Sequence, residues 1–155
     1  MDREKLPFQI SNADQVGIVV KDLDGTMEQF KLLLGIDDFE VVDWPKPGVD
    51  PELTYYGKPA EYKMRVAFTR LGNVQVELIE PGEGINVYGD FLKTHGPGLH
   101  HIRFSEKDFD QKYEQLQKAG IQMIASGRGM RSGATWAVFD TTKYLGIFIE
   151  LRMVE

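Results

Sequence analysis

One stretch near the middle of the chain decides the fold: Gly96-Pro97-Gly98-Leu99-His100-His101-Ile102-Arg103-Phe104. Two glycines flank a proline, which predicts a tight bend, and the alternation of apolar and polar residues after it predicts a strand. Successive side chains of a strand point to opposite faces. The strand therefore sends His100 to the core with Ile102 and Phe104, and it sends His101 to the other face with Arg103.

His101 has two interpretations on this stretch alone. It is either a hydrogen-bonded histidine of no chemical consequence or a group that opens onto a cavity and acts there. The chain has 3 histidines and no cysteine, so a metal ion would need nitrogen and oxygen ligands rather than thiolates. The third histidine, His95, falls at the end of a predicted helix, where a capping role is expected.

The composition is typical of one soluble globular domain over residues 1–155. The hydrophobic share of 42% is enough for a core at this length. The sequence shows no apolar run of membrane-spanning length and no signal-peptide pattern, so we expect a cytoplasmic protein with no membrane partner. A net charge of -6 argues against nucleic acid as a partner, because no large basic surface is available to release counterions.

Outward from this stretch, strands and helices are predicted from their apolar spacing. Residues 15–20 form a strand with Val16, Ile18 and Val20 on one face. Asp22 or Asp24 then caps a helix that Gly35 ends, and its core-facing stripe is Met27, Phe30, Leu33 and Leu34. The other predicted strands are 39–42, 63–71, 74–79, 121–125, 134–139 and 146–151, with a hairpin turn at Gly72-Asn73 and a short helix through Phe91 and Leu92.

An internal repeat organises these elements. Lys21-Asp22-Leu23-Asp24 recurs as Lys107-Asp108-Phe109-Asp110, and each copy follows a strand and precedes a helix. The repeat predicts an α+β protein with module one at about 13–81, a connection at 82–97 and module two at about 98–153. Each module reads as a strand, a helix and then further strands.

Four polar residues share one position, on the strand face opposite an apolar stripe: Gln15, Glu77, His101 and Glu150. Two come from each copy, and Glu77 and Glu150 occupy matched strands, Val76-Glu77-Leu78 and Ile149-Glu150-Leu151. If the copies pair by pseudo-twofold symmetry, the four groups converge. An imidazole, two carboxylates and an amide oxygen suit a divalent metal ion such as zinc, cobalt, nickel, manganese or iron.

Two irregular segments hold further candidates for a small-molecule site. Residues 43–62 contain Trp44, Tyr55, Tyr56 and Tyr62 among prolines, which predicts an ordered covering loop that either packs on the sheet or encloses a ligand. Arg128 and Arg131, among the glycines of 127–133, either receive a substrate carboxylate or phosphate or are simply exposed.

Together these motifs resemble the vicinal-oxygen-chelate superfamily, which includes glyoxalase I, methylmalonyl-CoA epimerase, extradiol dioxygenases and bleomycin-resistance proteins. The resemblance rests on Gln-Val-Gly-Ile-Val-Val, Val-Glu-Leu-Ile-Glu-Pro, Gly-Pro-Gly-Leu-His-His-Ile and the closing Ile-Glu-Leu. It implies two tandem βαβββ modules in a cupped mixed sheet with outer helices, and a homodimer. The metal ligands that it implies are Gln15, Glu77, His101 and Glu150.

Within the superfamily, residues 91–102 look most like methylmalonyl-CoA epimerases. This resemblance implies a metal-dependent epimerase or isomerase of a small acyl-CoA such as methylmalonyl-CoA, acting through a metal-stabilised enolate. Glu150 would be a ligand, a base or both, and Glu61 best matches the second glutamate that faces it across the substrate carbon.

The ligand order also departs from that pattern. Those epimerases usually have histidine at the position of Gln15 and glutamine at that of Glu77, whereas Gln, Glu, His, Glu resembles animal glyoxalase I. The alternatives are therefore a glyoxalase I-type lyase, a dioxygenase, or a non-catalytic protein that binds an aromatic ligand. A dioxygenase is the less favoured enzyme, because a fourth protein ligand fits poorly with an open oxygen site.

Overall fold

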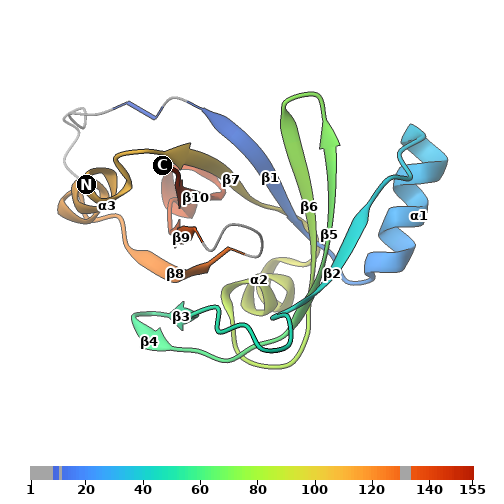
Figure 1. Ribbon diagram of the computed structural model, residues 1–155, viewed down its shortest axis with the longest axis horizontal. Helices are drawn as coiled ribbons and strands as arrows, with labels where there is room; N and C mark the ends of the chain where they lie inside the picture. The colour runs from blue at the N-terminus through green and yellow to red at the C-terminus, as the bar shows by residue number, and fades with distance from the viewer. Residues whose placement is uncertain (1–8, 11, 130–133) are drawn as a thin grey trace. The chain divides into compact units, whose positions relative to one another are not determined.

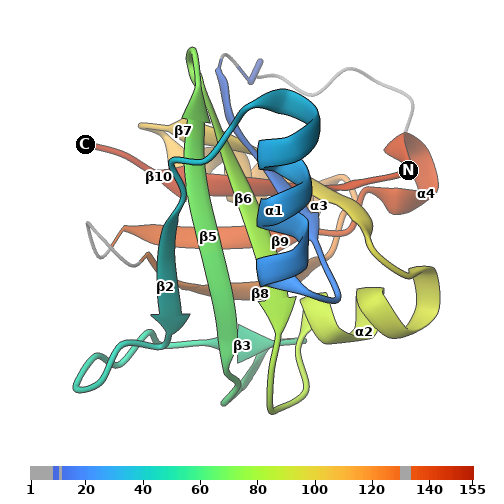
Figure 2. The ribbon, with the colours of Figure 1, turned by 90° about the vertical axis from the view of Figure 1, so that its right-hand side faces the viewer.

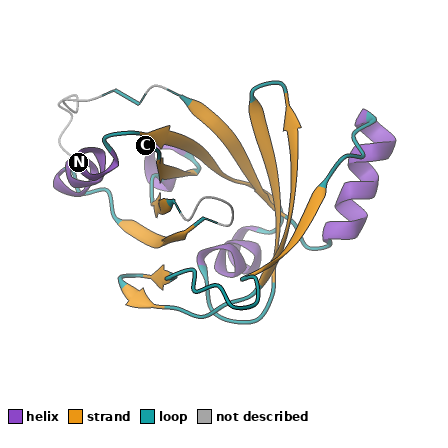
Figure 3. Cartoon of the chain, in the orientation of Figure 1, coloured by secondary structure: helices purple, strands orange, loops and turns teal. Residues whose placement is uncertain are grey.

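Both halves of the chain fold as a strand, a helix and then further strands. The computed structural model describes residues 9–10, 12–129 and 134–155. Over these residues it has ten strands and four helices (Figures 1 and 3), which confirms the predicted α+β class. None of the helices in this part of the chain has the length and apolar character that crossing a membrane requires.

The chain divides into two compact units, which we describe separately. The N-unit comprises Gln15–Asp50 and Glu61–His100. The C-unit comprises His101–Glu155, Pro51–Ala60 and the described residues up to Asp14. Residues 51–60 thus lie in the first half of the sequence but fold with the second half.

The sheet of the N-unit is mixed and has the strand order β2-β5-β6-β1. These strands are β1 (Ala13–Val19), β2 (Glu40–Trp44), β5 (Met64–Leu71) and β6 (Val74–Pro81). β1 and β6 run parallel, whereas β5 is antiparallel to both β2 and β6. Helix α1 (Leu23–Leu34) lies against β5 and β6 (Figure 2) and buries Leu23 with Ala67, Val76 and Leu78. The opposite face of β1 and β6 carries the polar residues.

Helix α1 begins and ends where predicted, but its apolar stripe is shorter. The Asp22 side chain accepts a hydrogen bond from the Gly25 amide at 3.0 Å, and Gly35 ends the helix at φ 69°. Met27 and Phe30 pack on the core, whereas Leu33 and Leu34 are 75% and 65% exposed. The prediction that these two leucines face the core was wrong, because the core cluster of this unit takes its helix contacts from the turns before them.

The C-unit repeats this plan with two additional short strands. Its strand order is β7-β10-β9-β8-β3-β4 (Figure 1), with β7 and β10 parallel. Helix α3 (Phe109–Lys118) buries Phe109 and Leu116 against Phe139, Ile149 and Leu151. The remaining elements are β3 (Thr54–Tyr55), β4 (Lys58–Pro59), α2 (Val87–His95, in the N-unit), β7 (Gly98–Glu106), β8 (Met123–Arg128), β9 (Thr135–Phe139), α4 (Thr142–Leu145) and β10 (Phe148–Met153).

Residues 51–60, here called the strap, are an added edge of this sheet rather than an irregular loop. Tyr55 pairs with Ala125, and the Tyr56 amide donates to the Ile124 carbonyl at 2.8 Å. A Cβ on Gly127 would come within 2.9 Å of a Leu53 methyl and 2.6 Å of the Trp136 ring. The glycine therefore allows Leu53 to pack closely on the sheet.

Candidate metal centre

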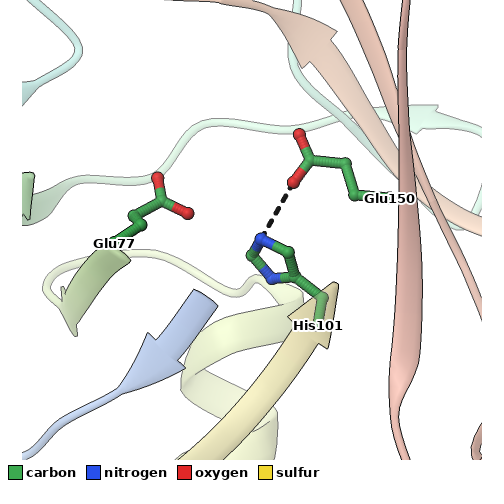
Figure 4. A group of neighbouring side chains, drawn as sticks. All are labelled: Glu77, His101 and Glu150. Atoms are coloured by element: carbon green, nitrogen blue, oxygen red, sulfur yellow. Dashed lines mark ion pairs between the residues drawn. The ribbon is translucent and has the colours of Figure 1, made fainter. Parts of the chain in front are cut away.

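His101 and Glu150 form the half-site of the C-unit. On the parallel strands β7 and β10, His101 pairs with Phe148 and Arg103 pairs with Glu150. Glu150 therefore lies two residues along β10 from the partner of His101, and the side chains of His101 and Glu150 share the face opposite α3. The His101 Nε2 and a Glu150 carboxylate oxygen are 3.0 Å apart (Figure 4). Both residues are buried, at 0% and 7% exposure.

Gln15, Gln75 and Glu77 form the half-site of the N-unit. Gln15 on β1 pairs with Gln75 on β6, and the next same-face pair is Gly17 with Glu77. The Gln15 amide nitrogen donates to the Gln75 side-chain oxygen at 2.7 Å. Figure 4 shows Glu77 extending from β6. Because Gln75 and Glu77 are two residues apart on a strand, both lie on the face opposite α1.

The two half-sites have the same construction. In each unit the first strand runs parallel to the last strand, and the carboxylate lies two residues beyond the register partner of Gln15 or His101. Gln15 and His101 therefore occupy equivalent positions, and so do Glu77 and Glu150. This is the equivalence that the sequence repeat predicts.

The donor atoms of the C-unit half-site fit a divalent metal ion. The 3.0 Å contact of His101 with Glu150 is an ion-pair contact that brings an imidazole nitrogen and a carboxylate oxygen together, and both are donor types that such ions bind. The carboxylate of Glu77 and the amide of Gln15 add donor types that suit borderline and hard ions.

Glu61, the predicted second acid or base, lies elsewhere in the N-unit. It is exposed in the segment before β5, and the neighbouring Lys63 amide bonds to the Glu83 carbonyl at 2.7 Å. The pairing of the two strands thus continues past Met64. Glu77 pairs with Phe68, so Glu61 lies about 20 Å along the strand direction from that point.

The other polar candidates have structural contacts. Arg128 Nε donates to Glu52 of the strap at 2.8 Å, and Arg131 lies outside the described residues. His100 is buried, with ring centroids 4.9 Å from Tyr88 and 5.0 Å from Phe91. It packs as predicted, while His95 stacks on Phe91 at the end of α2.

A charged cluster on the same face as His101 and Glu150 was missed by the sequence analysis. Arg103 Nε donates to Asp14 at 2.8 Å, and Ser105 bonds to the same carboxylate. Arg152 Nη2 lies 3.5 Å from Asp14. The alternation along β7 and β10 was a signal for the two arginines, but nothing local in the sequence indicates Asp14 as their partner.

Comparison with known proteins identifies the family. The model of the glyoxalase/bleomycin resistance protein/dioxygenase superfamily matches residues 14–139. The chain belongs to this superfamily. The superfamily predicted from the motifs is thereby confirmed.

Several superfamily members similar to this chain are named as epimerases. The ethylmalonyl-CoA/methylmalonyl-CoA epimerase of Cereibacter sphaeroides is 29% identical over 119 residues, which cover 76% of this chain and 78% of that protein. The human mitochondrial methylmalonyl-CoA epimerase is 26% identical over 119 residues, covering 76% of this chain and 59% of that protein. The uncharacterised protein YqjC of Bacillus subtilis is 34% identical over 94 residues, 59% of this chain and 66% of that protein.

Solved structures of proteins named as methylmalonyl-CoA epimerases share the fold. Methylmalonyl-CoA epimerase from Mycobacterium tuberculosis has a TM-score of 0.67 at 22% identity, covering 99% of this chain and 94% of that chain. A methylmalonyl-CoA epimerase in complex with methylmalonyl-CoA and NH4+ has a TM-score of 0.63 at 22% identity, covering 94% and 95%.

Proposed function

We propose that this protein is a metal-dependent epimerase or isomerase of a small acyl-CoA, with methylmalonyl-CoA as the substrate to test first. The observation that carries the proposal is the buried contact of the His101 imidazole with the Glu150 carboxylate, which brings a nitrogen and an oxygen donor together without a thiolate. The similarity to proteins named as methylmalonyl-CoA epimerases supports the choice of substrate.

The proposed metal ligands are Gln15, Glu77, His101 and Glu150, two from each half-site. Glu77, His101 and Glu150 supply two carboxylates and an imidazole, the donors of a divalent-ion centre without thiolates. When bound, the ion would supply Lewis acidity that makes the proton beside the thioester carbonyl easier to remove.

Glu150 is the residue proposed to move that proton. One of its oxygens lies at His101, and the other is proposed to take the proton from the substrate carbon. Epimerisation also requires a proton donor on the opposite face of that carbon. The family resemblance implies Glu61 as this donor, but Glu61 lies about 20 Å along the strand from the register position of Glu77, too far for both residues to contact one small substrate carbon.

A glyoxalase I-type lyase is the second candidate. It is favoured by the N-unit half-site, where an amide and a carboxylate, Gln15 and Glu77, occupy the two ligand positions. Both reactions move a proton next to a carbonyl, so they differ in substrate rather than in the type of proton transfer.

The first experiment measures metal content in protein purified without chelator. We expect one divalent ion per chain. A metal-free protein that gains no thermal stability from added cobalt or nickel would exclude both enzyme functions and favour a ligand-binding protein of the same fold.

The second experiment incubates the metal-loaded protein with methylmalonyl-CoA in heavy water. We expect deuterium at the α-carbon, and at least a roughly 100-fold slower exchange in Glu150→Gln. Glu28→Gln, an exposed substitution on α1, is the matched control. Glu61→Gln should leave inversion unchanged because of its distance from Glu77, and slowed inversion would restore Glu61 to the mechanism. Absence of exchange in the wild type would eliminate the epimerase and leave the lyase, tested with an adduct of a 2-oxoaldehyde and a thiol.

A further inference from the structure

Gln75 lies beside one proposed metal ligand and has no place in the proposed ligand set. We infer that Gln75 is a positioning residue that determines which atom Gln15 presents to the metal ion. This inference rests on the proposed function, because it assumes that Gln15 is a ligand.

The contact between the two glutamines is defined by strand register. Gln15 and Gln75 are direct partners on the parallel strands β1 and β6, and the amide nitrogen of Gln15 donates to the side-chain oxygen of Gln75 at 2.7 Å. Gln15 is 2% exposed. Because the Gln15 amide nitrogen bonds to Gln75, the amide oxygen of Gln15 points away from Gln75.

The orientation of this amide matters because its two ends differ chemically. The amide oxygen carries lone pairs that bind a cation, whereas the NH2 group is only a donor. An amide turned by half a rotation would present N–H bonds to the ion. In the orientation seen here, Gln75 presents its oxygen rather than its NH2 group to Gln15, which favours the metal-competent orientation of the Gln15 amide.

The other half-site has no such partner at the matching position. Phe148 is the register partner of His101, and the Glu150 carboxylate contacts the imidazole instead. The polar register partner, Gln75, thus lies opposite Gln15, the proposed ligand whose amide has an oxygen end and a nitrogen end. This contrast favours an orienting role for Gln75 over general packing.

Cobalt binding tests the inference, read by the visible spectrum and by the dissociation constant from a competition titration. In Gln75→Leu, which removes the acceptor, we expect at least a roughly 10-fold weaker affinity and an altered spectrum, the size typical of losing a residue that orients a ligand. Gln75→Glu keeps the acceptor and should retain the wild-type affinity and spectrum.

A second background separates orientation from charge. Gln15→Met removes the proposed ligand, so adding Gln75→Leu to it should cause no further loss of cobalt affinity. If Gln75→Glu instead binds cobalt more tightly than the wild type, and this gain persists in Gln15→Met, the effect is one of charge alone and contradicts the inference. Wild-type cobalt affinity and spectrum in Gln75→Leu would also overturn it. If the wild type itself binds no cobalt, the proposed function fails and this inference fails with it.

Discussion

Charged side chains buried in the C-unit are paired with one another. Glu106 and Lys112 are 4% and 5% exposed and are bonded to each other, and the Lys112 Nζ also lies 3.2 Å from Asp108. Burial alone would lower the pKa of Lys112. The hydrogen bonds to Glu106 and Asp108, with their negative charges, outweigh burial and raise that pKa above its usual value. Lys112 therefore stays charged through the neutral range.

Removing one member of this pair should be far more costly than removing both. Lys112→Met leaves Glu106 buried without its cation, and we expect a loss of about 3–5 kcal/mol in the free energy of unfolding. The double variant Lys112→Met, Glu106→Leu should recover most of that loss. Urea unfolding followed by circular dichroism measures both. A single variant as stable as the wild type would contradict this account of the pair.

Asp24 makes a pH-dependent contribution on the acid side. The hydrogen bond from Arg65, at 3.1 Å, and the arginine charge lower the pKa of Asp24 below its usual value. A carboxyl group with a lower pKa in the folded state contributes stability above its unfolded pKa of about 3.9 and loses it as pH falls through the folded value. Asp24→Asn should therefore lose less stability than the wild type between pH 5 and pH 2, in urea titrations at each pH. Glu114→Gln is the exposed control, and an identical acid-side fall in wild type and Asp24→Asn would refute the prediction.

At the scale of elements, the packing of the strap depends on Gly127. Gly127→Ala would place a methyl group against the Trp136 ring and Leu53, so we expect a loss of about 1–3 kcal/mol and faster proteolysis within residues 51–60. Gly129→Ala, whose Cβ would come no closer than 3.4 Å to a neighbour, is the matched control. Equal proteolysis rates in the two variants would show that the strap does not depend on this contact.

The same four-residue motif precedes helices α1 and α3, but its first aspartate makes different contacts in the two places. The repeated Lys-Asp-x-Asp motif precedes both α1 and α3 as predicted, yet Asp22 caps α1 with its side chain and Asp108 instead lies near Lys112. The motif predicts a helix start because an aspartate there can accept an amide hydrogen bond. Which partner it takes depends on the residues of the following turn.

At the scale of the whole molecule, metal binding should raise thermal stability. An ion that binds only the folded state adds about 2.7 kcal/mol at a concentration of 100 times its dissociation constant. For a chain of this size, that corresponds to a rise of roughly 5–10 °C in Tm. Scanning calorimetry with cobalt should show this rise in the wild type and its reversal by chelator. His101→Ala should show no rise, and an equal rise in this variant would place the ion elsewhere.

Much of the fold and of the candidate site was predictable from the sequence. Face alternation placed His101 and Glu150 on the polar faces of two strands, and the repeat matched them with Gln15 and Glu77. Both signals can be read from the sequence without knowing which strands pair. The contact of Gln75 with Gln15 needed the register of β1 and β6. The pairing of the strap with β8 needed the choice of a distant partner strand, which a local pattern does not specify.

The second half of the chain should not fold well when it is expressed alone, because it then lacks the strap. It covers the edge of β8 with backbone that the first half encodes, so a fragment expressing only residues 98–155 would leave that edge unpaired. Unpaired strand edges template association between chains. The second half alone should therefore aggregate.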